Sequence, residues 1–264
     1  MRPVVVQLSA SLDAAANRAA VERVLGTVDP AQRPDVVLLP EATMADFGRQ
    51  DTDLRPLAEP LDGPFVDLLL THARRLGTTV VAGMFEATDD LPFNTLVAAG
   101  PDGDLVATYR KIHLYDSFGY RESERLAAGD LEPVTVPVGD ELLGLMTCYD
   151  LRFPELARAL VDRGAEALAV PAAWLAGDRK LEHWRTLLAA RAIENTVGVV
   201  AAAQCGRGYT GHSMVLDASG AVLAEAGDEP AVLTADLDPE ALREVRATNP
   251  SLANRRMGRT EVRR

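Results

Sequence analysis

An apolar run gives way to the start of a helix within Gly144-Leu145-Met146-Thr147-Cys148-Tyr149-Asp150-Leu151-Arg152-Phe153-Pro154-Glu155. Residues Leu142 to Thr147 have the composition of a buried strand, and Pro154 is suited to the first turn of a helix that extends to Arg163. Cys148 lies at the elbow between the two, a place where a nucleophile is commonly held. The stretch therefore predicts an α/β fold with a candidate reactive cysteine at the end of a strand.

The same order of strand and helix is found on both sides of this stretch. The first half predicts strands at Val4 to Leu8, Val36 to Leu39 and Thr79 to Gly83, helices at Ala14 to Leu25 and Pro64 to Leu76, and a hairpin of Asn94 to Ala99 with Leu105 to Tyr109. The second half predicts strands at Ala167 to Val170 and Val197 to Ala203, a helix at Leu181 to Asn195, and a hairpin of Met214 to Leu216 with Ala221 to Ala224. Two similar halves with strands beneath helices favour a layered α/β sandwich.

Composition excludes several classes of function. The chain has 264 residues, of which 47% are hydrophobic, and no segment resembles a linker, so we expect a single domain over residues 1–264. A formal charge of -12 disfavours nonspecific binding to nucleic acid or anionic membranes. The run Val4 to Val6 is too short for a signal peptide, and no stretch approaches the roughly 18 apolar residues of a membrane helix. Two cysteines make no disulfide framework, so we expect a reduced, cytoplasmic setting.

The C-terminal tail, about residues 247–264, is basic. Its charge comes from arginines that we expect to be solvated or to contact a partner subunit rather than an anionic partner: Arg255, Arg256, Arg259, Arg263 and Arg264.

Lysine is scarce in a way that singles out one position. Of the 27 basic Lys and Arg residues only two are lysines, Lys111 and Lys180. Lys111 directly follows Arg110, so simple positive charge is already supplied there, and the position requires a compact ammonium. Lys180 belongs to no motif, and we expect it to tolerate arginine.

Three candidate groups follow predicted strands: Glu41, Lys111 and Cys148. The carboxyl ends of strands form the edge at which open α/β sheets usually place their sites. Each residue also has an ordinary interpretation, because a buried cysteine is usually inert, a glutamate after a proline often caps a helix, and a lysine after a strand is usually solvated.

Together the three groups provide a nucleophile, a base and an electrophile. Cys148 would attack as a thiolate, with a pKa lowered by the helix start near Pro154. Glu41 would take the thiol proton, return it to a departing amine and later activate water. Lys111 and the backbone N–H of Tyr149 would stabilise the oxyanion.

These motifs resemble the nitrilase superfamily of carbon-nitrogen hydrolases, which use a Glu, Lys, Cys triad. The likeness extends from the first strand to about Arg246. It is carried by Leu38-Leu39-Pro40-Glu41, Tyr109-Arg110-Lys111-Ile112-His113-Leu114, Thr147-Cys148-Tyr149-Asp150-Leu151-Arg152-Phe153-Pro154-Glu155-Leu156, His183-Trp184, Arg191-Ala192-Ile193-Glu194-Asn195, Ala201-Ala202-Ala203-Gln204-Cys205-Gly206-Arg207 and Gly211-His212-Ser213.

The resemblance implies a four-layer αββα sandwich whose protomers pair through their helical faces into a homodimer or higher oligomer. It also implies a second glutamate that binds the lysine. Glu122 matches this position because it directly precedes Ser123, whereas Glu124 does not.

Other signals are set aside. The run Gly206 to Gly211 satisfies G-x-G-x-x-G, but a strand rather than a helix follows it, so a turn is expected. His113 or His183 could partner the cysteine, although His113 is expected to support the lysine loop and His183 the packing of its helix. Scattered histidines predict no metal site, and we expect no cofactor. Residues near the motifs are expected to shape a substrate pocket: Tyr115, Phe118, Tyr120, Arg152, Trp174 and His183.

We expect an amidase that releases ammonia from a small linear carboxamide through a thioester on Cys148. Cys-Tyr-Asp after the strand resembles the amidase branches, and the flanking motifs resemble deaminated glutathione amidase and, less closely, ω-amidase. Two enzyme alternatives remain open, an N-carbamoyl amino acid hydrolase and a nitrilase, although nitrile-cleaving members typically have Cys-Trp-Glu. A catalytically silent binding or scaffold protein on the same fold is a third alternative.

Overall fold

The computed structural model describes residues 1–206 and 208–257, and the first half of the chain contributes five strands to a six-stranded sheet. In chain order this half contains β1 (Pro3–Gln7), α1 (Ala14–Thr27), β2 (Val36–Leu38), α2 (Pro64–Leu76), β3 (Thr79–Glu86), β4 (Phe93–Ala99) and β5 (Leu105–Arg110). Strands β1, β2 and β3 are parallel, and β4 and β5 continue the sheet in antiparallel pairs. Strand β14 (Ala231–Thr234) closes the other edge against β1.

The second half repeats this plan in a second six-stranded sheet. It contains β8 (Thr135–Val138), β9 (Glu141–Leu145), α3 (Pro154–Asp162), β10 (Ala167–Ala172), α4 (Lys180–Asn195), β11 (Gly198–Ala203), β12 (Met214–Leu216) and β13 (Val222–Glu225). Strands β9, β10 and β11 are parallel, and β12 and β13 follow in antiparallel pairs. The two halves therefore share one topology, as their sequence patterns predict.

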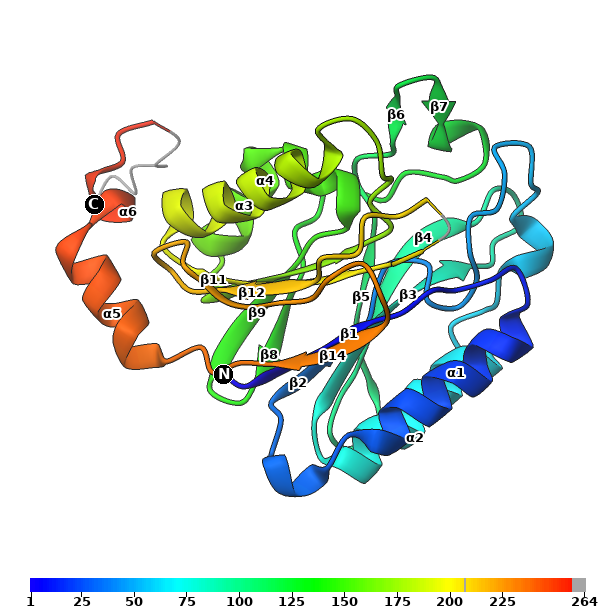
Figure 1. The fold of residues 1–264 in the computed structure, drawn as a ribbon, viewed down its shortest axis with the longest axis horizontal. Helices are drawn as coiled ribbons and strands as arrows, with labels where there is room; N and C mark the ends of the chain where they lie inside the picture. Colours follow the sequence, from blue (N-terminus) through cyan, green and yellow to red (C-terminus); the bar gives the residue numbers. More distant parts are fainter. Residues whose placement is uncertain (207, 258–264) are drawn as a thin grey trace.

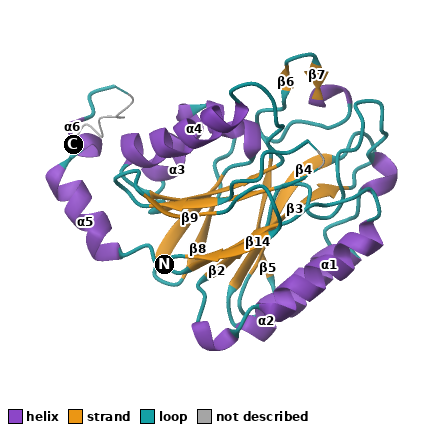
Figure 2. Ribbon diagram, in the orientation of Figure 1, coloured by secondary structure: helices purple, strands orange, loops and turns teal. Residues whose placement is uncertain are grey.

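The two sheets and four helices stack into four layers (Figures 1 and 2). Helices α1 and α2 cover the outer face of the first sheet, and α3 and α4 cover the second. The sheets face each other where β1 and β2 meet β11. Successive side chains of β1 point to opposite faces of its sheet. Val4 packs with Leu25 of α1, whereas Val5 packs with the second sheet. The predicted αββα sandwich is confirmed.

Local signals position the main helices. Helix α1 begins after Asp13, whose carboxylate accepts hydrogen bonds from the N–H groups of Ala15 and Ala16. Helix α2 has Pro64 in its first turn and ends at Gly77, which has a left-handed φ of 62°. Strands β1, β10 and β11 are buried along their whole length because a layer covers each face of their sheet.

Three regular elements have no counterpart among the predicted ones: β8, β14 and α5 (Pro239–Thr248). Strand β8 contains Pro137, which weakens a strand signal but is tolerated because β8 is an edge strand. Strand β14 is half exposed and is defined by its pairing with β1. Short segments complete the fold: the 3-10 turns Pro30–Gln32, Arg55–Leu57, Glu122–Glu124 and Cys148–Arg152, the two-residue strands β6 (Asp116–Ser117) and β7 (Tyr120–Arg121), and α6 (Ser251–Asn254).

Only part of the basic tail can be placed. Arg255 forms an ion pair of 2.8 Å with Asp162 at the end of α3 in its own chain. Arg259, Arg263 and Arg264 lie outside the described residues. The contact of this tail with a partner subunit stays a prediction.

Candidate active site

The carboxyl ends of strands from both sheets meet at one end of the sandwich, and Cys148 lies there. It is the first residue of a 3-10 turn that precedes α3, and its φ of 47° is left-handed. A non-glycine residue in this region carries backbone strain, which is often found at functional sites. The elbow predicted from the sequence is therefore present, with a 3-10 turn between the cysteine and the helix.

The buried carboxylate of Asp150 holds this elbow to the loop that follows β5. It accepts hydrogen bonds from the N–H of Thr147 at 2.9 Å, the hydroxyl of Tyr109 at 2.6 Å and the N–H of His113 at 3.1 Å. His113 thus supports the lysine loop, as expected, and its ring stacks on Phe153 with centroids 3.8 Å apart.

Glu41 follows β2 and is held from the opposite sheet. Its Oε2 accepts the backbone N–H of Ala173 at 2.6 Å, and its carbonyl oxygen accepts the side-chain amide of Gln204 at 2.9 Å. Gly83 of β3 passes directly behind it, and a Cβ at Gly83 would lie 2.6 Å from the Cα of Glu41. Close backbone approach therefore requires glycine at this position.

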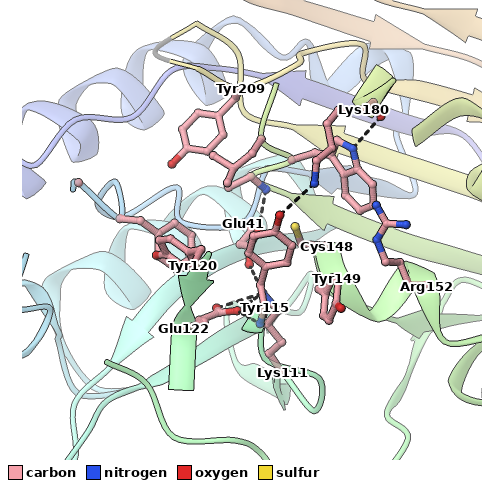
Figure 3. Close-up of a pocket in the computed structure, with 15 residues that line it drawn as sticks. Glu41, Lys111, Tyr115, Tyr120, Glu122, Cys148, Tyr149, Arg152, Lys180 and Tyr209 are labelled. Carbon is pink, nitrogen blue, oxygen red and sulfur yellow. Dashed lines mark hydrogen bonds and ion pairs between the residues drawn. The ribbon is translucent and has the colours of Figure 1, made fainter. Parts of the chain in front are cut away.

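Lys111 lies between two carboxylates. Its Nζ is 2.9 Å from Oε1 of Glu41 and 2.8 Å from Oε2 of Glu122, and all three side chains are almost fully buried (Figure 3). Burial alone would lower the pKa of Lys111, but the charges of Glu122 and Glu41 raise it well above its usual value. The ammonium is therefore strongly held as a cation. Glu124, the alternative to Glu122, is exposed and lies 3.7 Å from Arg121.

Asn94 of β4 is a site residue that the sequence analysis did not identify. Its side-chain amide donates to Oε1 of Glu41 at 2.7 Å and to Oε1 of Glu122 at 3.1 Å. Glu122 is further fixed by the backbone N–H of Tyr115 at 2.6 Å. The two carboxylates therefore keep a fixed position on either side of the lysine.

The acidity of Cys148 differs from the sequence-based expectation. Burial raises the pKa of its thiol well above the ordinary value, and the charge of Glu41 raises it further, whereas Lys111 opposes the shift. The expected lowering by the helix start is wrong because Cys148 is separated from α3 by the 3-10 turn and is buried beside a carboxylate. A thiol whose pKa is raised in this way needs a base to ionise it near neutral pH.

These side chains line a pocket of about 550 Å³ that is open to solvent on one side. Among the predicted pocket residues, Tyr115, Tyr120, Arg152 and Trp174 line it, as do Glu41, Lys111, Glu122, Cys148 and Tyr149. Its other lining residues, which the sequence analysis did not identify, are Phe47, Gly48, Ala173, Leu175, Lys180 and Tyr209.

Two predicted pocket residues do not line the cavity. Phe118 is 72% exposed at the turn between β6 and β7, where its φ of 55° is left-handed. His183 lies on α4 behind Arg152, with its Nδ1 3.4 Å from Nη2 of that arginine. Both residues contact pocket side chains from outside.

Lys180 is the most informative addition. It begins α4, and its Nζ donates to the hydroxyl of Tyr115 at 2.9 Å. Lys180 was not predicted to belong to the pocket, yet both lysines of the chain line it, and its tolerance of arginine stays a prediction. The scarcity of lysine was a signal that applied to both positions.

Within residues 1–206 and 208–257, no group of three or more His, Cys, Asp or Glu side chains is arranged to hold a metal ion. No helix in the described part of the chain is long and apolar enough to cross a membrane.

Comparison with known proteins agrees with this geometry. The chain belongs to the carbon-nitrogen hydrolase family, which it matches over residues 5–247. It is 44% identical to deaminated glutathione amidase of Escherichia coli O157:H7 over 221 residues, which are 83% of this chain and 84% of that protein. It is 36% identical to 2-oxoglutaramate amidase of Paenarthrobacter nicotinovorans over 249 residues, which are 89% of this chain and 83% of that protein.

A solved structure is similar over nearly the whole chain. It is a CN-hydrolase superfamily protein from Xanthomonas campestris with an arsenic adduct in its active site, and it superposes with a TM-score of 0.87 at 33% identity, covering 97% of each chain. The predicted superfamily and enzyme class are thus confirmed: the protein is an amidase-type hydrolase that acts on carbon-nitrogen bonds.

Proposed function

We propose that the protein hydrolyses a small linear primary carboxamide with a carboxylate at its far end, releasing ammonia through a thioester on Cys148 and without a cofactor. The observation that carries this proposal is the convergence of Glu41, Lys111, Glu122 and Cys148 on the floor of one pocket.

Acylation begins with the protonated thiol. Glu41 takes the proton as the Sγ of Cys148 attacks the amide carbon, so that a C–S bond forms and the carbonyl oxygen becomes an oxyanion. Glu41 then gives the proton to the amide nitrogen. The C–N bond breaks, ammonia leaves, and the acyl group stays on Cys148.

Two donors stabilise the oxyanion. An ammonium has three N–H donors, and when Glu41 takes one and Glu122 accepts a single bifurcated bond, one donor of Lys111 is left for the substrate. The second donor is the backbone N–H of Tyr149, near the start of the 3-10 turn, where N–H groups have no acceptor within the turn.

In the hydrolysis of the thioester, Glu41 acts first as a base toward water and then as an acid toward the sulfur of Cys148. Glu41 takes a proton from water as its oxygen attacks the thioester carbon, and the second tetrahedral intermediate uses the same two donors. Its collapse breaks the C–S bond, and the proton on Glu41 returns to the sulfur. The products are ammonia and a carboxylic acid, and the free enzyme is restored.

A screen for ammonia release tests the proposal. Wild-type protein is assayed with ω-amides of dicarboxylic and keto acids, α-keto acid amides, N-carbamoyl amino acids and the nitriles that match the amides. We expect the ω-amides to be hydrolysed far faster than the matching nitriles. Quenching during turnover should leave the acyl mass on the peptide that contains Cys148. Faster turnover of nitriles, carbon dioxide release from carbamoyl substrates as the main activity, or an adduct on another residue would each contradict the proposal.

The proposal extends to setting and assembly. Both cysteines are free, which suits a reduced compartment such as the cytoplasm. We place the enzyme there as a homodimer or higher homo-oligomer that acts on small molecules rather than on nucleic acid or membranes. Size-exclusion chromatography with light scattering tests the assembly.

A further inference from the structure

The upper wall of the pocket carries a lysine that has no part in the proposed chemistry. The Nζ of Lys180 donates to the hydroxyl of Tyr115 at 2.9 Å (Figure 3). It also lies 3.9 Å from the centroid of the Phe118 ring. Both aromatic residues belong to the segment around β6 and β7 that borders the pocket. Lys180 is half-buried, so its ammonium has already lost part of its water.

A second cation lies beside it. The guanidinium of Arg152 stacks over the ring of Trp174 at 5.0 Å, and its buried Nε has no hydrogen-bond partner among the described residues. Burial lowers the pKa of Lys180, and the nearby charge of Arg152 lowers it further. Two like charges are thus held together in one wall.

Neither cation is neutralised by the protein. In the described parts of the chain, no carboxylate lies within ion-pair distance of Lys180 or Arg152, and the nearby Glu182 is paired with Arg179 at 2.7 Å. A charge that has lost part of its water is stabilised when an opposite charge lies beside it. An anion in the pocket would supply the missing partner.

The floor of the pocket has the opposite sign. Two carboxylates, Glu41 and Glu122, share the single ammonium of Lys111, which leaves one formal negative charge in excess. An anionic group is therefore repelled from the floor and attracted to the wall. A substrate with one carboxylate is oriented by this difference, with its neutral amide toward Cys148.

We propose that Lys180, assisted by Arg152, is a specificity-determining residue that binds the far carboxylate of the substrate. This inference rests on the proposed amidase function and assigns its substrate selectivity to one side chain. Lys180 is a better residue to substitute than Arg152. Its ammonium contacts only uncharged aromatic side chains, so replacing Lys180 leaves no carboxylate of the protein without a partner.

The experiment compares two amides of equal length, the monoamide of glutaric acid and pentanamide, which has a methyl group in place of the carboxylate. We expect wild-type protein to prefer the charged amide in kcat/KM. Lys180→Met should lower that preference about 10- to 100-fold, mainly through KM, because one hydrogen bond to a charged group is lost. Lys180→Arg should restore most of the preference. Lys180→Glu should shift it toward 5-aminopentanamide, which carries an ammonium at the same end.

Tyr115→Phe is the matched control, since it removes the hydroxyl that Lys180 contacts and keeps the charge. If Lys180→Met and Tyr115→Phe change the preference equally, Lys180 acts by holding the aromatic segment, and the inference is wrong. Equal kcat/KM for both amides in wild-type protein, or an equal loss for both in Lys180→Met, overturns the inference and leaves the amidase function standing. No ammonia from these two amides or from any other amide in the screen overturns both the inference and the amidase function.

Discussion

Ala173 donates its backbone N–H to Oε2 of Glu41 across 2.6 Å, and this bond links the segment after β10 in one sheet to the carboxylate after β2 in the other. The second oxygen of Glu41 accepts from Lys111 and Asn94. Both oxygens of the proposed base are thus acceptors in the resting enzyme, Oε1 toward groups of its own sheet and Oε2 toward the opposite sheet.

Glu41→Gln should therefore lose more than a base. An amide has one acceptor oxygen, so its NH₂ group must face either Ala173 or the pair of donors on the other side. We expect kcat to fall by about 10² to 10⁴, the usual contribution of a general acid-base residue, with a small loss of stability. Steady-state kinetics and urea unfolding measure the two effects. An active Glu41→Gln protein would contradict the assigned base.

Glu122→Gln should lower kcat about 10- to 100-fold because the lysine loses a charged partner and the N–H of Tyr115 loses a strong acceptor. Glu124→Gln is the matched control, two residues away and exposed. Kinetics of both variants with the same amide separate the roles. Similar losses in the two would show that Glu122 has been assigned wrongly.

Lys111→Arg should lose most activity although its formal charge is kept. The guanidinium is larger than an ammonium and cannot fit between Glu41 and Glu122 with a donor left for the oxyanion. A loss of one oxyanion donor suggests a fall of about 10² to 10³ in kcat. Arg110→Lys is the control, because Arg110 pairs with Glu86 outside the pocket. Normal turnover by Lys111→Arg would refute the geometric argument.

Cys148→Ala should abolish turnover and keep the fold, since it removes the nucleophile and creates only a small cavity. Iodoacetamide should label Cys148 before Cys205 because Cys148 lines the pocket and is 8% exposed, whereas Cys205 is 1% exposed. Mass spectrometry of tryptic peptides over time gives the two rates. Equal rates in native protein would contradict the assignment.

Stability should fall as the solution becomes alkaline. The folded state raises the pKa of Cys148 well above its ordinary 9.0 through burial, so between pH 9 and that raised value the folded chain keeps a proton that the unfolded chain releases. The unfolding free energy then decreases with rising pH, by about 1.4 kcal/mol per pH unit for each proton fully released. Tyr109 adds to this decrease above its ordinary 10.0, and Cys205, with a pKa raised by burial to about 11, acts in the same direction.

Urea unfolding at pH 8, 9 and 10 measures this effect. The Cys148→Ala protein should lose less stability than wild type between pH 9 and 10. An identical pH dependence in the two proteins would mean that the thiol is not held protonated by the fold.

The sequence predicts the order of elements and the three strand-end residues well, because Glu41, Lys111 and Cys148 each follow an apolar run whose end is visible locally. Asn94 could not be found in this way. Its position in a strand is evident, but its role depends on β4 lying between β3 and β5, so that its amide reaches both glutamates.

The pKa of Cys148 and the position of Lys180 also differ from the sequence-based expectations, for the same physical reason. The raised pKa of Cys148 comes from burial and from Glu41, which is 107 positions earlier in the chain. Lys180 reaches the pocket because the loop after β10 brings the start of α4 over Tyr115. A local sequence pattern does not show which distant segments surround a side chain. Those segments decide both the pKa of Cys148 and the position of Lys180.

The pairing of two glutamates with one lysine also affects the release of the product after the amide has been hydrolysed. Hydrolysis turns a neutral amide into a carboxylate beside Glu41 and Glu122, whose formal charges already exceed that of Lys111. Like charges that lie close together in a site shielded from water repel one another strongly. The product is therefore expelled by the same groups that formed it, so the free acid should be a weak inhibitor, and turnover should continue while it accumulates.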